Sequence, residues 1–440
     1  MLYFSFFGNM IVGIEIMIKN VQRSIPLKGE ITIPADKSIS HRAIMLASLA
    51  NGKSVITNFS SGADCWSTLN IFKRLGIEIN EINKKTIEIK SGGYLQKPFF
   101  PLDAGNSGTT TRLLTGILAG QGFDSEIIGD TSLSKRPMKR IILPLTQMGA
   151  KIDSVDGHLP LTIHGEKLHG IIYNSPISSA QVKSSILLAG LNAEGQTTVI
   201  EPVQSRNHTE LMLEYMGAEI STDNNKVTVL PSKLTAKDIE IVGDISSAAF
   251  FIVAGLIIPG SDFVIKNVGI NPTRTGIFDI VKRMGGEVNV FNRRILAGEE
   301  CADIRVQYTD SLRGCVIEGS DIPKLIDELP VIAVLASQAE GETIVKNAED
   351  LRNKEADRIT CLVSELKKIG ADIDETADGF IISGKSKLKG GVELQTYNDH
   401  RLAMSFYVAG LICEKEIVIN GFEWTDISFP EFSEIISQLQ

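Results

Sequence analysis

The chain has 440 residues, and its 44 Lys and Arg against 53 Asp and Glu give a formal net charge of −9. That length is too great for one hydrophobic core and suits two domains of about 200 residues each. The negative charge excludes a global basic field for nucleic acid, so an anionic ligand would need a local cluster of Lys and Arg.

The cysteines and histidines carry no metal or disulfide signature. The five cysteines lie far apart and form no CxxC pair, which is typical of reduced thiols in the cytoplasm. The six histidines form no HExxH motif. We therefore expect a cytoplasmic protein that needs no metal and no cofactor.

Residues 1–18 are apolar but lack the basic region and the small-residue cleavage site of a signal peptide. Gly and Asn interrupt the segment, and it is short for a membrane span, so we expect no membrane association. We predict a dispensable extension, with Met10 and Met17 as alternative starts, that leads into a first strand near Val21.

One pattern recurs six times along the chain: a polar start, an apolar helix, a turn and a strand. The apolar helices are predicted at residues 38–50, 107–120, 179–190, 246–255, 327–336 and 400–410. In five copies a second helix ends at a C-capping glycine, namely Gly76, Gly149, Gly217, Gly285 and Gly370. The spacing of about 70 residues makes each copy a βαβαββ-sized unit.

The six helices are nearly apolar all round and carry polar residues at their N-terminal ends, so we expect them to be buried within a domain. We predict one domain from residues 1–34 plus 244–440 and an inserted domain at 35–243, joined by two short crossings that act as a hinge. The positive ends of the helices would then face a cleft between the domains, an arrangement for a multiply anionic ligand.

Several polar segments hold clustered cations. They are Asp36–Arg42, Gly105–Arg112, Lys135–Arg140, Leu351–Arg358 and Asn398–Arg401. Ser107 would cap a helix whose free N–H groups and Arg112 could hold an anion. Taken alone, each segment also fits an ordinary capped helix or a solvated charged turn.

One motif match is misleading. Residues 379–386 satisfy the Walker A spacing, but Phe380–Ile382 reads as a strand and no buried helix follows. The strand, loop and helix context of a P-loop is missing, so we predict none.

Five strings occur in an order that closely resembles the 5-enolpyruvylshikimate-3-phosphate synthase family, in its class II-like bacterial form. They are DKSISHR (36–42), GNSGTTTR (105–112), KRPM (135–138), NKEADR (353–358) and NDHR (398–401). The resemblance covers about residues 20–440. It implies an α/β fold of two similar domains, each an inverse α/β barrel of three βαβαββ units, with the active site in the cleft between them.

The resemblance also implies a reaction, in which phosphoenolpyruvate and shikimate 3-phosphate give 5-enolpyruvylshikimate 3-phosphate and phosphate. Asp327 would be the general base at the shikimate hydroxyl, Glu355 would transfer a proton at the enolpyruvyl methylene, and Lys37 would assist. Two separate carboxylates suit a reaction in which one proton goes to carbon while another leaves a hydroxyl.

Matched by motif, shikimate 3-phosphate would be bound by Lys37, Ser38, Arg42, Ser179, Ala180, Gln181, Ser205, Asp327 and Lys354. Phosphoenolpyruvate would be bound by Lys37, Gly108, Arg136, Gln181, Arg358 and Arg401. Glyphosate should compete with phosphoenolpyruvate, because Gly108 leaves room for it. We expect a monomer.

The chain departs from the family pattern at three places. Thr425–Pro430 lacks the Lys that commonly precedes the last aromatic-Pro pair, Ala180 replaces a frequent Ser, and His208 stands where a Tyr is common. These departures concern the finer substrate contacts.

Two other functions compete with this reading. The sister enzyme that acts on UDP-N-acetylglucosamine usually carries a Cys before its Arg-Pro pair, and Asp130–Arg136 has none. A non-catalytic anion-binding module would not need both Asp327 and Glu355 at polar helix starts.

Overall fold

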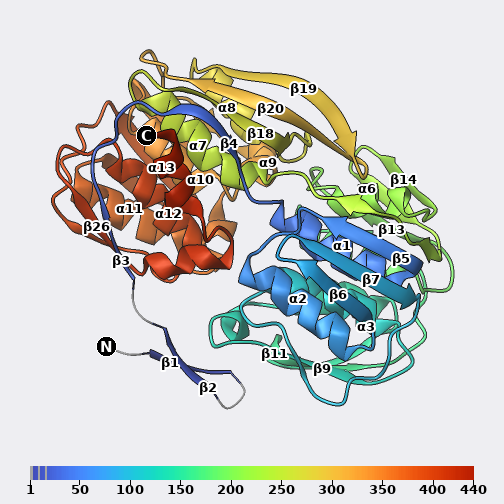
Figure 1. The fold of residues 1–440 in the computed structure, drawn as a ribbon. Helices are drawn as coiled ribbons and strands as arrows, with labels where there is room; N and C mark the ends of the chain where they lie inside the picture. The colour runs from blue at the N-terminus through green and yellow to red at the C-terminus, as the bar shows by residue number, and fades with distance from the viewer. Residues whose placement is uncertain (1–2, 8–9, 15–16) are drawn as a thin grey trace.

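The computed structural model describes residues 3–7, 10–14 and 17–440, with side chains from residue 17 onward. Short sheets surround buried helices in an α/β arrangement (Figure 1). Two hydrophobic cores divide the chain. One gathers buried side chains from residues 35–242 together with Cys301, and the other gathers them from 21–33 and 245–439. We call residues 35–243 the inserted half and residues 17–34 with 244–440 the outer half; the two domains with the boundaries given above stay a prediction.

The inserted half holds three sheets, with strand orders β16-β5-β7-β6 (and β17 beside β5), β10-β11-β9-β8 and β12-β13-β15-β14. Their strands are β5 (Ala50–Thr57), β6 (Glu78–Asn83), β7 (Thr86–Gly92), β8 (Leu102–Asp103), β9 (Ser125–Ile128), β10 (Lys151–Val155), β11 (His158–His164), β12 (Ile172–Asn174), β13 (Thr197–Ile200), β14 (Ile220–Asp223), β15 (Lys226–Val229), β16 (Leu234–Thr235) and β17 (Ile239–Glu240). The helices are α1 (Lys37–Leu49), α2 (Ala63–Arg74), α3 (Gly108–Ala119), η1 (Leu133–Lys135), α4 (Lys139–Gln147), α5 (Ala180–Gly190) and α6 (His208–Tyr215).

The outer half also holds three sheets, with strand orders β19-β20-β18-β4, β21-β22-β24-β23 and β25-β26-β3. Their strands are β3 (Ile18–Val21), β4 (Lys28–Thr32), β18 (Asp262–Gly269), β19 (Val288–Leu296), β20 (Glu299–Gln307), β21 (Val316–Ile317), β22 (Gly341–Val345), β23 (Asp372–Thr376), β24 (Gly379–Gly384), β25 (Glu393–Gln395) and β26 (Ile417–Asn420). The helices are α7 (Ile245–Ile257), α8 (Gly276–Arg283), η2 (Gly319–Asp321), α9 (Ile322–Leu325), α10 (Leu329–Ala336), η3 (Glu349–Asn353), α11 (Arg358–Ile369), α12 (His400–Gly410), η4 (Phe422–Ile427) and α13 (Phe432–Leu439).

The expected repetition is visible in the strand pairing. Each of these six sheets has parallel pairing at one edge and antiparallel pairing elsewhere. The predicted glycine C-caps are confirmed, because all five have a left-handed φ between +82° and +102°. That conformation closes a helix at little cost only for glycine.

The first helix of each repeat is buried, as predicted. Every residue of α7, α10 and α12 is buried, and α3 packs against α5 as α10 packs against α12. The fifth repeat differs from the prediction, since its main helix begins at Leu329 and not at Asp327. Pro330 occupies the first turn of α10, where it needs no hydrogen-bond partner, and Asp327 lies in the link from α9.

The two crossings between the halves lie side by side. Ala35 and Gly243 form an antiparallel bridge. The amide of Asp36 donates to the carbonyl of Val242 at 2.8 Å, and the amide of Asp244 donates to Pro34 at 2.9 Å. These bonds join the starts of α1 and α7, which belong to different halves.

The N-terminal segment forms a separate hairpin of β1 (Tyr3–Phe7) and β2 (Met10–Ile14), and the strand predicted near Val21 is β3 (Figure 1). The rest of the expected extension, residues 1–2, 8–9 and 15–16, lies outside the described residues. The segment that matches the Walker A spacing contains strand β24 (Gly379–Gly384), so the predicted strand is confirmed.

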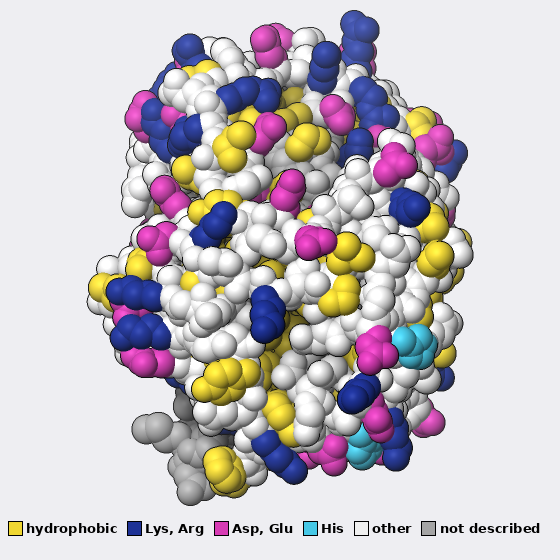
Figure 2. Space-filling view, turned by 90° about the vertical axis from the view of Figure 1, so that its right-hand side faces the viewer, with side chains coloured by type: hydrophobic (Ala, Val, Ile, Leu, Met, Phe, Trp, Pro, Cys, Tyr) yellow, Lys and Arg dark blue, Asp and Glu magenta, His cyan; other side chains and the backbone are white. Residues whose placement is uncertain are grey.

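Two further features concern the length of the described helices and the distribution of charge on the surface. None of the described helices is both long and apolar enough to cross a membrane. On the face shown in Figure 2, basic and acidic side chains are interspersed, and no broad field of either sign gathers there.

Candidate active site

Helix starts supply the backbone frame of the site. Asp36, Ser107 and Asp399 accept hydrogen bonds from the first turns of α1, α3 and α12, as expected of N-caps. Ser179 stands at the start of α5 without such a bond, and its own amide donates to Glu201 at 3.0 Å. Free N–H groups at such starts favour anions.

Charged side chains from the two halves meet directly. Arg136 of the inserted half lies 3.6 Å from Glu355 of the outer half, and Arg140 lies 3.2 Å from Asp350. Arg206 of the inserted half binds the carboxylate of Asp327. The predicted site residues from the two halves are therefore brought together across one interface.

Asp327 is surrounded by cations. Besides Arg206, its carboxylate faces Arg358 at 3.4 Å, Lys354 at 3.7 Å and Arg401 at 3.9 Å. Burial alone would raise the pKa of Asp327, but these four cations outweigh it and hold the pKa well below its ordinary value. The carboxyl is ionised at neutral pH, as a base must be, but it is a weak one while all four cations stay in place.

Glu355 is held in the same manner. Its carboxylate accepts from Arg358 at 2.6 Å and faces Arg136. Burial would raise the pKa of Glu355, yet Arg358 and Arg136 lower it well below the usual value. Arg358 itself is 1% exposed and donates to Asp399 at 2.7 Å, so that one guanidinium orders three carboxylates, those of Asp327, Glu355 and Asp399.

Lys37 opens α1, and its ammonium lies 3.1 Å from the carboxylate of Asp64 on α2. Burial opposes its charge, but Asp64 and Glu355 outweigh burial and raise the pKa of Lys37. Lys37 is therefore a permanent cation at a helix N-terminus. Asp64 could not be predicted as the partner of Lys37, because the two residues lie 27 positions apart and no local pattern links them.

Gly108 begins α3 beside two guanidinium groups. A Cβ added there would lie 3.3 Å from Nη1 of Arg136 and 3.7 Å from Nη1 of Arg112. Arg136 also donates to Asn106 at 2.8 Å. A side chain at position 108 would thus press on Arg136, which is why a glycine suits this position.

Arg112 is a functional candidate that the motif matching did not assign to a substrate. It is 9% exposed and donates to the side-chain oxygen of Gln181, whose amide nitrogen donates to Thr109 at 3.0 Å. Burial and the nearby Arg140 and Arg136 lower the pKa of Arg112 to about 10, so it remains cationic at neutral pH. The position of Arg112, one helical turn after Gly108 in the sequence, could have suggested this role.

The residues predicted to bind shikimate 3-phosphate differ in what they contact in this structure. Arg42 is 4% exposed and donates to Thr209 at 2.7 Å and Ser184 at 2.9 Å, while the carbonyl of Ser38 accepts from it at 2.9 Å. Burial lowers the pKa of Arg42 to about 10.

Ala180 is the first residue of α5, next to Gln181. Ser205 is 3% exposed, and its hydroxyl donates to Glu201 at 2.6 Å, so in this structure it serves that buried carboxylate.

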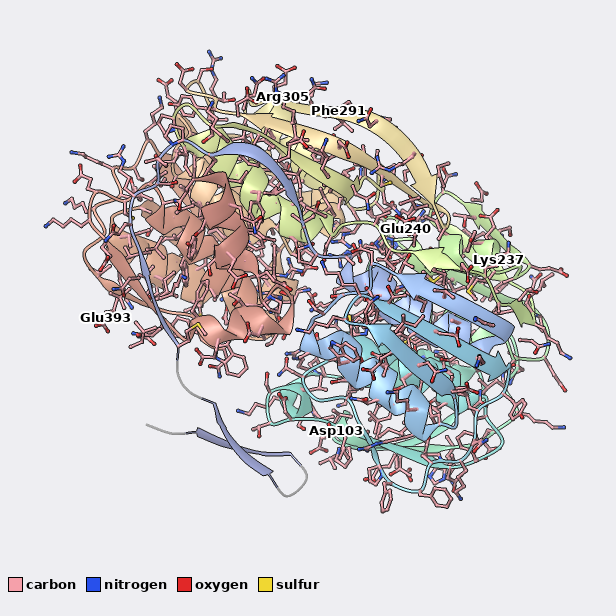
Figure 3. All side chains as sticks on the ribbon, in the orientation of Figure 1. Asp103, Lys237, Glu240, Phe291, Arg305 and Glu393 are labelled. Carbon is pink, nitrogen blue, oxygen red and sulfur yellow. The ribbon has the colours of Figure 1, made fainter. Side chains whose placement is uncertain are left out.

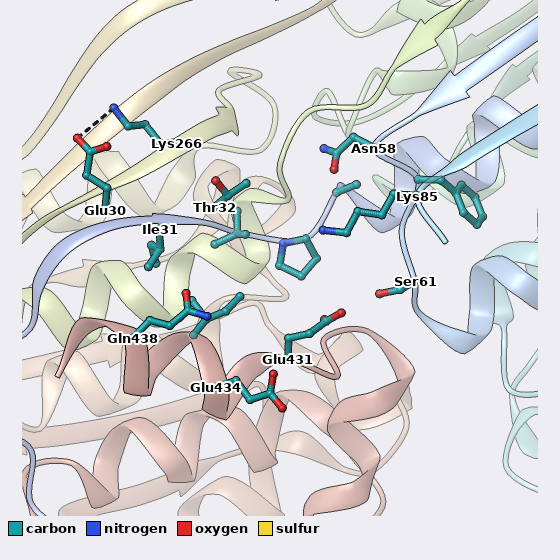
Figure 4. Close-up of a pocket in the computed structure, with 15 residues that line it drawn as sticks. Glu30, Ile31, Thr32, Asn58, Ser61, Lys85, Lys266, Glu431, Glu434 and Gln438 are labelled. Atoms are coloured by element: carbon teal, nitrogen blue, oxygen red, sulfur yellow. Dashed lines mark ion pairs between the residues drawn. The ribbon is translucent and has the colours of Figure 1, made fainter. Parts of the chain in front are cut away.

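A cavity of about 500 Å³ lies elsewhere (Figure 4), and Ile33 and Pro34 of the first crossing are among the residues that line it. Lys85 of the inserted half and Glu431 and Glu434 of the outer half line it, and none of the predicted site residues does. In the candidate site the charged groups contact one another instead. Across the described residues, no group of three or more His, Cys, Asp or Glu is placed to hold a metal ion.

This arrangement can hold two anions and move protons. Cations from both halves and several helix starts converge where two carboxylates stand, so negatively charged substrates would replace carboxylates as partners of the guanidinium groups. Removing those cations from Asp327 and Glu355 would raise their pKa values and make proton transfer easier.

Comparison with known proteins agrees with these observations. The family model described as EPSP synthase (3-phosphoshikimate 1-carboxyvinyltransferase) matches residues 21–436. A 3-phosphoshikimate 1-carboxyvinyltransferase of Thermoanaerobacter sp. (strain X514) is 52% identical over 416 residues, 94% of this chain and 98% of the relative. One of Brevibacillus brevis is 50% identical over 423 residues, 95% of this chain and 99% of the relative.

Solved structures extend the likeness to the fold. EPSP synthase from Acinetobacter baumannii is 43% identical, with a TM-score of 0.86 over 97% of this chain and 98% of that one. The enolpyruvyl transferase NikO from Streptomyces tendae, at 17% identity, shares the fold with a TM-score of 0.79 over 97% of each chain. The expected two-part inverse α/β fold is confirmed.

Proposed function

The chain belongs to the EPSP synthase (3-phosphoshikimate 1-carboxyvinyltransferase) family, and from this membership we infer that it transfers the enolpyruvyl group of phosphoenolpyruvate to the 5-hydroxyl of shikimate 3-phosphate. Phosphate is the second product. The reaction belongs to the shikimate pathway, which leads to chorismate and the aromatic amino acids. One observation carries the assignment to this site: Asp327 and Glu355 meet the cations of the other half, Arg206 and Arg136.

Substrate binding falls to the cations and helix starts. Shikimate 3-phosphate is held by two helix starts and one lysine. These residues are Lys37, Ser38 and Arg42 on α1, Ser179–Gln181 at the start of α5, and Lys354. Arg136, Arg358 and Arg401 hold the carboxylate and phosphate of phosphoenolpyruvate, with Gly108 leaving the space. The burial of Arg42, Arg358 and Arg401, each at most 9% exposed, supports these roles, because buried cations gain most from an anionic partner.

Proton transfer falls to the two carboxylates. Asp327 accepts the proton of the 5-hydroxyl as the hydroxyl oxygen bonds to the central carbon of phosphoenolpyruvate. Glu355 takes up a proton from solvent once the substrates have drawn its cations away, and it delivers that proton to the methylene carbon. In the elimination step Glu355 takes a proton back from the new methyl group while phosphate leaves. The low pKa values of Asp327 and Glu355 require that substrates first draw Arg206, Arg136 and Arg358 away from them.

Leaving-group departure needs positive charge at the phosphate oxygens. Lys37 suits this task, since its pKa is raised and its ammonium lies at a helix N-terminus. Ser205 fits a supporting role, because its hydroxyl serves Glu201 and Glu201 in turn holds the start of α5.

Further proposals concern inhibition, assembly and location. Glyphosate competes with phosphoenolpyruvate, supported by the missing side chain at Gly108, where a Cβ would lie 3.3 Å from Nη1 of Arg136. The chain acts as a monomer, because both halves of the site belong to one chain. It acts in the cytoplasm, supported by five cysteines that form no disulfide.

The competing functions are less well supported. Transfer to UDP-N-acetylglucosamine usually uses a Cys before the Arg-Pro pair, and the sequence has no Cys between Cys65 and Cys301. A non-catalytic anion-binding protein would not need the two partly buried carboxylates of Asp327 and Glu355. Phosphate release with both substrates tests the proposal; no release above that with either substrate alone would refute it.

A further inference from the structure

The two crossings bring a pair of buried carboxylates together. Asp36 caps α1 of the inserted half, and Asp244 caps α7 of the outer half. They are 3% and 8% exposed. The antiparallel bridge between the crossings fixes both caps at the point where the halves join. Two ionised carboxylates buried this close would repel each other unless a cation stood between them.

Arg274 is that cation. It lies between β18 and α8 and is 2% exposed. One end of its guanidinium lies 3.3 Å from Asp36, and the other lies 3.4 Å from Asp244 and donates to Ser246 at 2.6 Å. Nothing in the family's motif strings includes Arg274, and 238 residues separate it from Asp36.

The contacts of Arg274 lead to the site. Asp244 also accepts from the backbone amide of Lys37 at 3.5 Å. Lys37 follows Asp36 directly and is the first residue of α1. Arg274 thus pairs with Asp36, which precedes Lys37 in the chain, and with Asp244, which accepts from the amide of Lys37.

A second chain of contacts anchors Arg274 from outside. Nε2 of His208, on α6, lies 3.3 Å from Arg274, and Nδ1 of His208 lies 2.6 Å from Glu299 on β20. With its proton on Nδ1, the ring donates to Glu299 and accepts from Arg274. His208 is one of the departures from the family pattern, and here it faces the crossing.

The hairpin of β19 and β20 belongs to the outer half, yet its tip rests on the inserted half, where Gly298 lies against Leu211 and Tyr215 of α6. Figure 3 shows Phe291 and Arg305 along this hairpin, with Glu240 of the inserted half below its tip. Arg274 therefore stands where both crossings and this hairpin meet.

We propose that Arg274 is a positioning residue for enolpyruvyl transfer: it bridges Asp36 and Asp244 across the crossings and thereby holds α1, with Lys37 at its start, in the closed arrangement of the two halves. This inference rests on the proposed function. Loss of the guanidinium would leave two buried carboxylates facing each other, and the halves would separate to hydrate them.

The test compares R274A, R274K and a matched control, R283A. Arg283 lies on α8, is 41% exposed in its side chain and pairs with Asp321 at 2.6 Å. We expect R274A to lower kcat/KM at least tenfold and to raise KM for phosphoenolpyruvate, because an ion pair that joins the halves is lost. Adding 20–50 mM guanidinium should restore part of the lost kcat/KM. R274K, which keeps the charge but cannot span both carboxylates, should recover only part of the activity. R283A should match the wild type with and without guanidinium.

Small-angle scattering supplies a readout that does not depend on turnover. Shikimate 3-phosphate should compact the wild type and R283A but compact R274A less. Full compaction of R274A, absence of guanidinium rescue in a folded R274A, or wild-type kinetics of R274K would each overturn the proposal. If R274A does not fold, R274K alone decides. A wild type that compacts but releases no phosphate would refute the proposed function. The scattering of R274A would then decide whether Arg274 holds the halves together.

Discussion

The guanidinium of Arg136 lies 3.6 Å from the carboxylate of Glu355, although the two residues belong to different halves of the chain. Glu355 is also held by Arg358 at 2.6 Å, so two cations keep it ionised. The contact places a group that we assign to proton transfer beside one that we assign to phosphoenolpyruvate.

E355Q should abolish turnover and leave the protein folded. The amide keeps the shape of the side chain but can neither deliver nor accept the proton, a loss of about 10²–10⁴ in rate for a general acid–base group. Steady-state phosphate release measures it, and E349Q, an exposed glutamate of η3, is the control. Activity within about tenfold of the wild type, some 1.4 kcal/mol of barrier, would remove this role from Glu355.

K37M should also abolish turnover, for a different reason. The methionine fills similar space but cannot neutralise the substrate anions, and it leaves Asp64 without its partner at 3.1 Å. We expect binding of shikimate 3-phosphate by calorimetry to weaken together with kcat. K53M, which removes an exposed lysine of β5 that pairs with Glu88, should change neither. Substrate affinity equal to that of the wild type would contradict the binding role.

Local chemistry accounts for much of what the sequence could predict. Ser107 and Asp399 cap helices because their side chains suit that position, and Gly370 ends α11 because its φ is +102°. Those features depend on residues within one or two turns of each other. The cation-rich strings of the site were equally readable, because each is continuous in sequence.

Long-range pairing could not be predicted in the same way. Arg206 meets Asp327 across 121 residues, and His208 meets Glu299 across 91. Which cation reaches which carboxylate depends on the path of the whole chain, and no local pattern encodes it.

G108A should raise KM for phosphoenolpyruvate and raise the Ki of glyphosate further. The added methyl would lie 3.3 Å from Nη1 of Arg136, so the guanidinium must shift by a few tenths of an ångström. G122A is the matched control, because nothing lies within 4 Å of a Cβ added there. Inhibition constants with phosphoenolpyruvate as the varied substrate measure the effect. An unchanged Ki would show that Gly108 does not border the inhibitor.

Shikimate 3-phosphate should draw the two halves together. The pairs Arg136–Glu355, Arg140–Asp350 and Arg206–Asp327 join the halves through charged side chains that the substrate can replace or bridge. Small-angle scattering of the wild type should therefore show a smaller radius of gyration with shikimate 3-phosphate than without it. Identical curves under both conditions would count against closure.

Acid should cost the wild type more stability than D327N. The pKa of Asp327 is well below its ordinary value in the folded state, so its stabilisation is fully present above the unfolded pKa of about 3.9. It is lost as pH falls through the lower, folded value. At pH 7 D327N should be less stable by about 3 kcal/mol, since four cations then face an uncharged amide.

Denaturant unfolding at pH 7, 5, 4 and 3 measures that difference, with D374N as the control. Asp374 is 75% exposed in its side chain and pairs only at the surface, with Lys367. The gap between wild type and D327N should stay constant from pH 7 to 5 and narrow towards pH 3, because only the wild type has to protonate this carboxyl. A gap that stayed the same at pH 3 would mean that Arg206 and its neighbours do not stabilise the fold through the charge of Asp327.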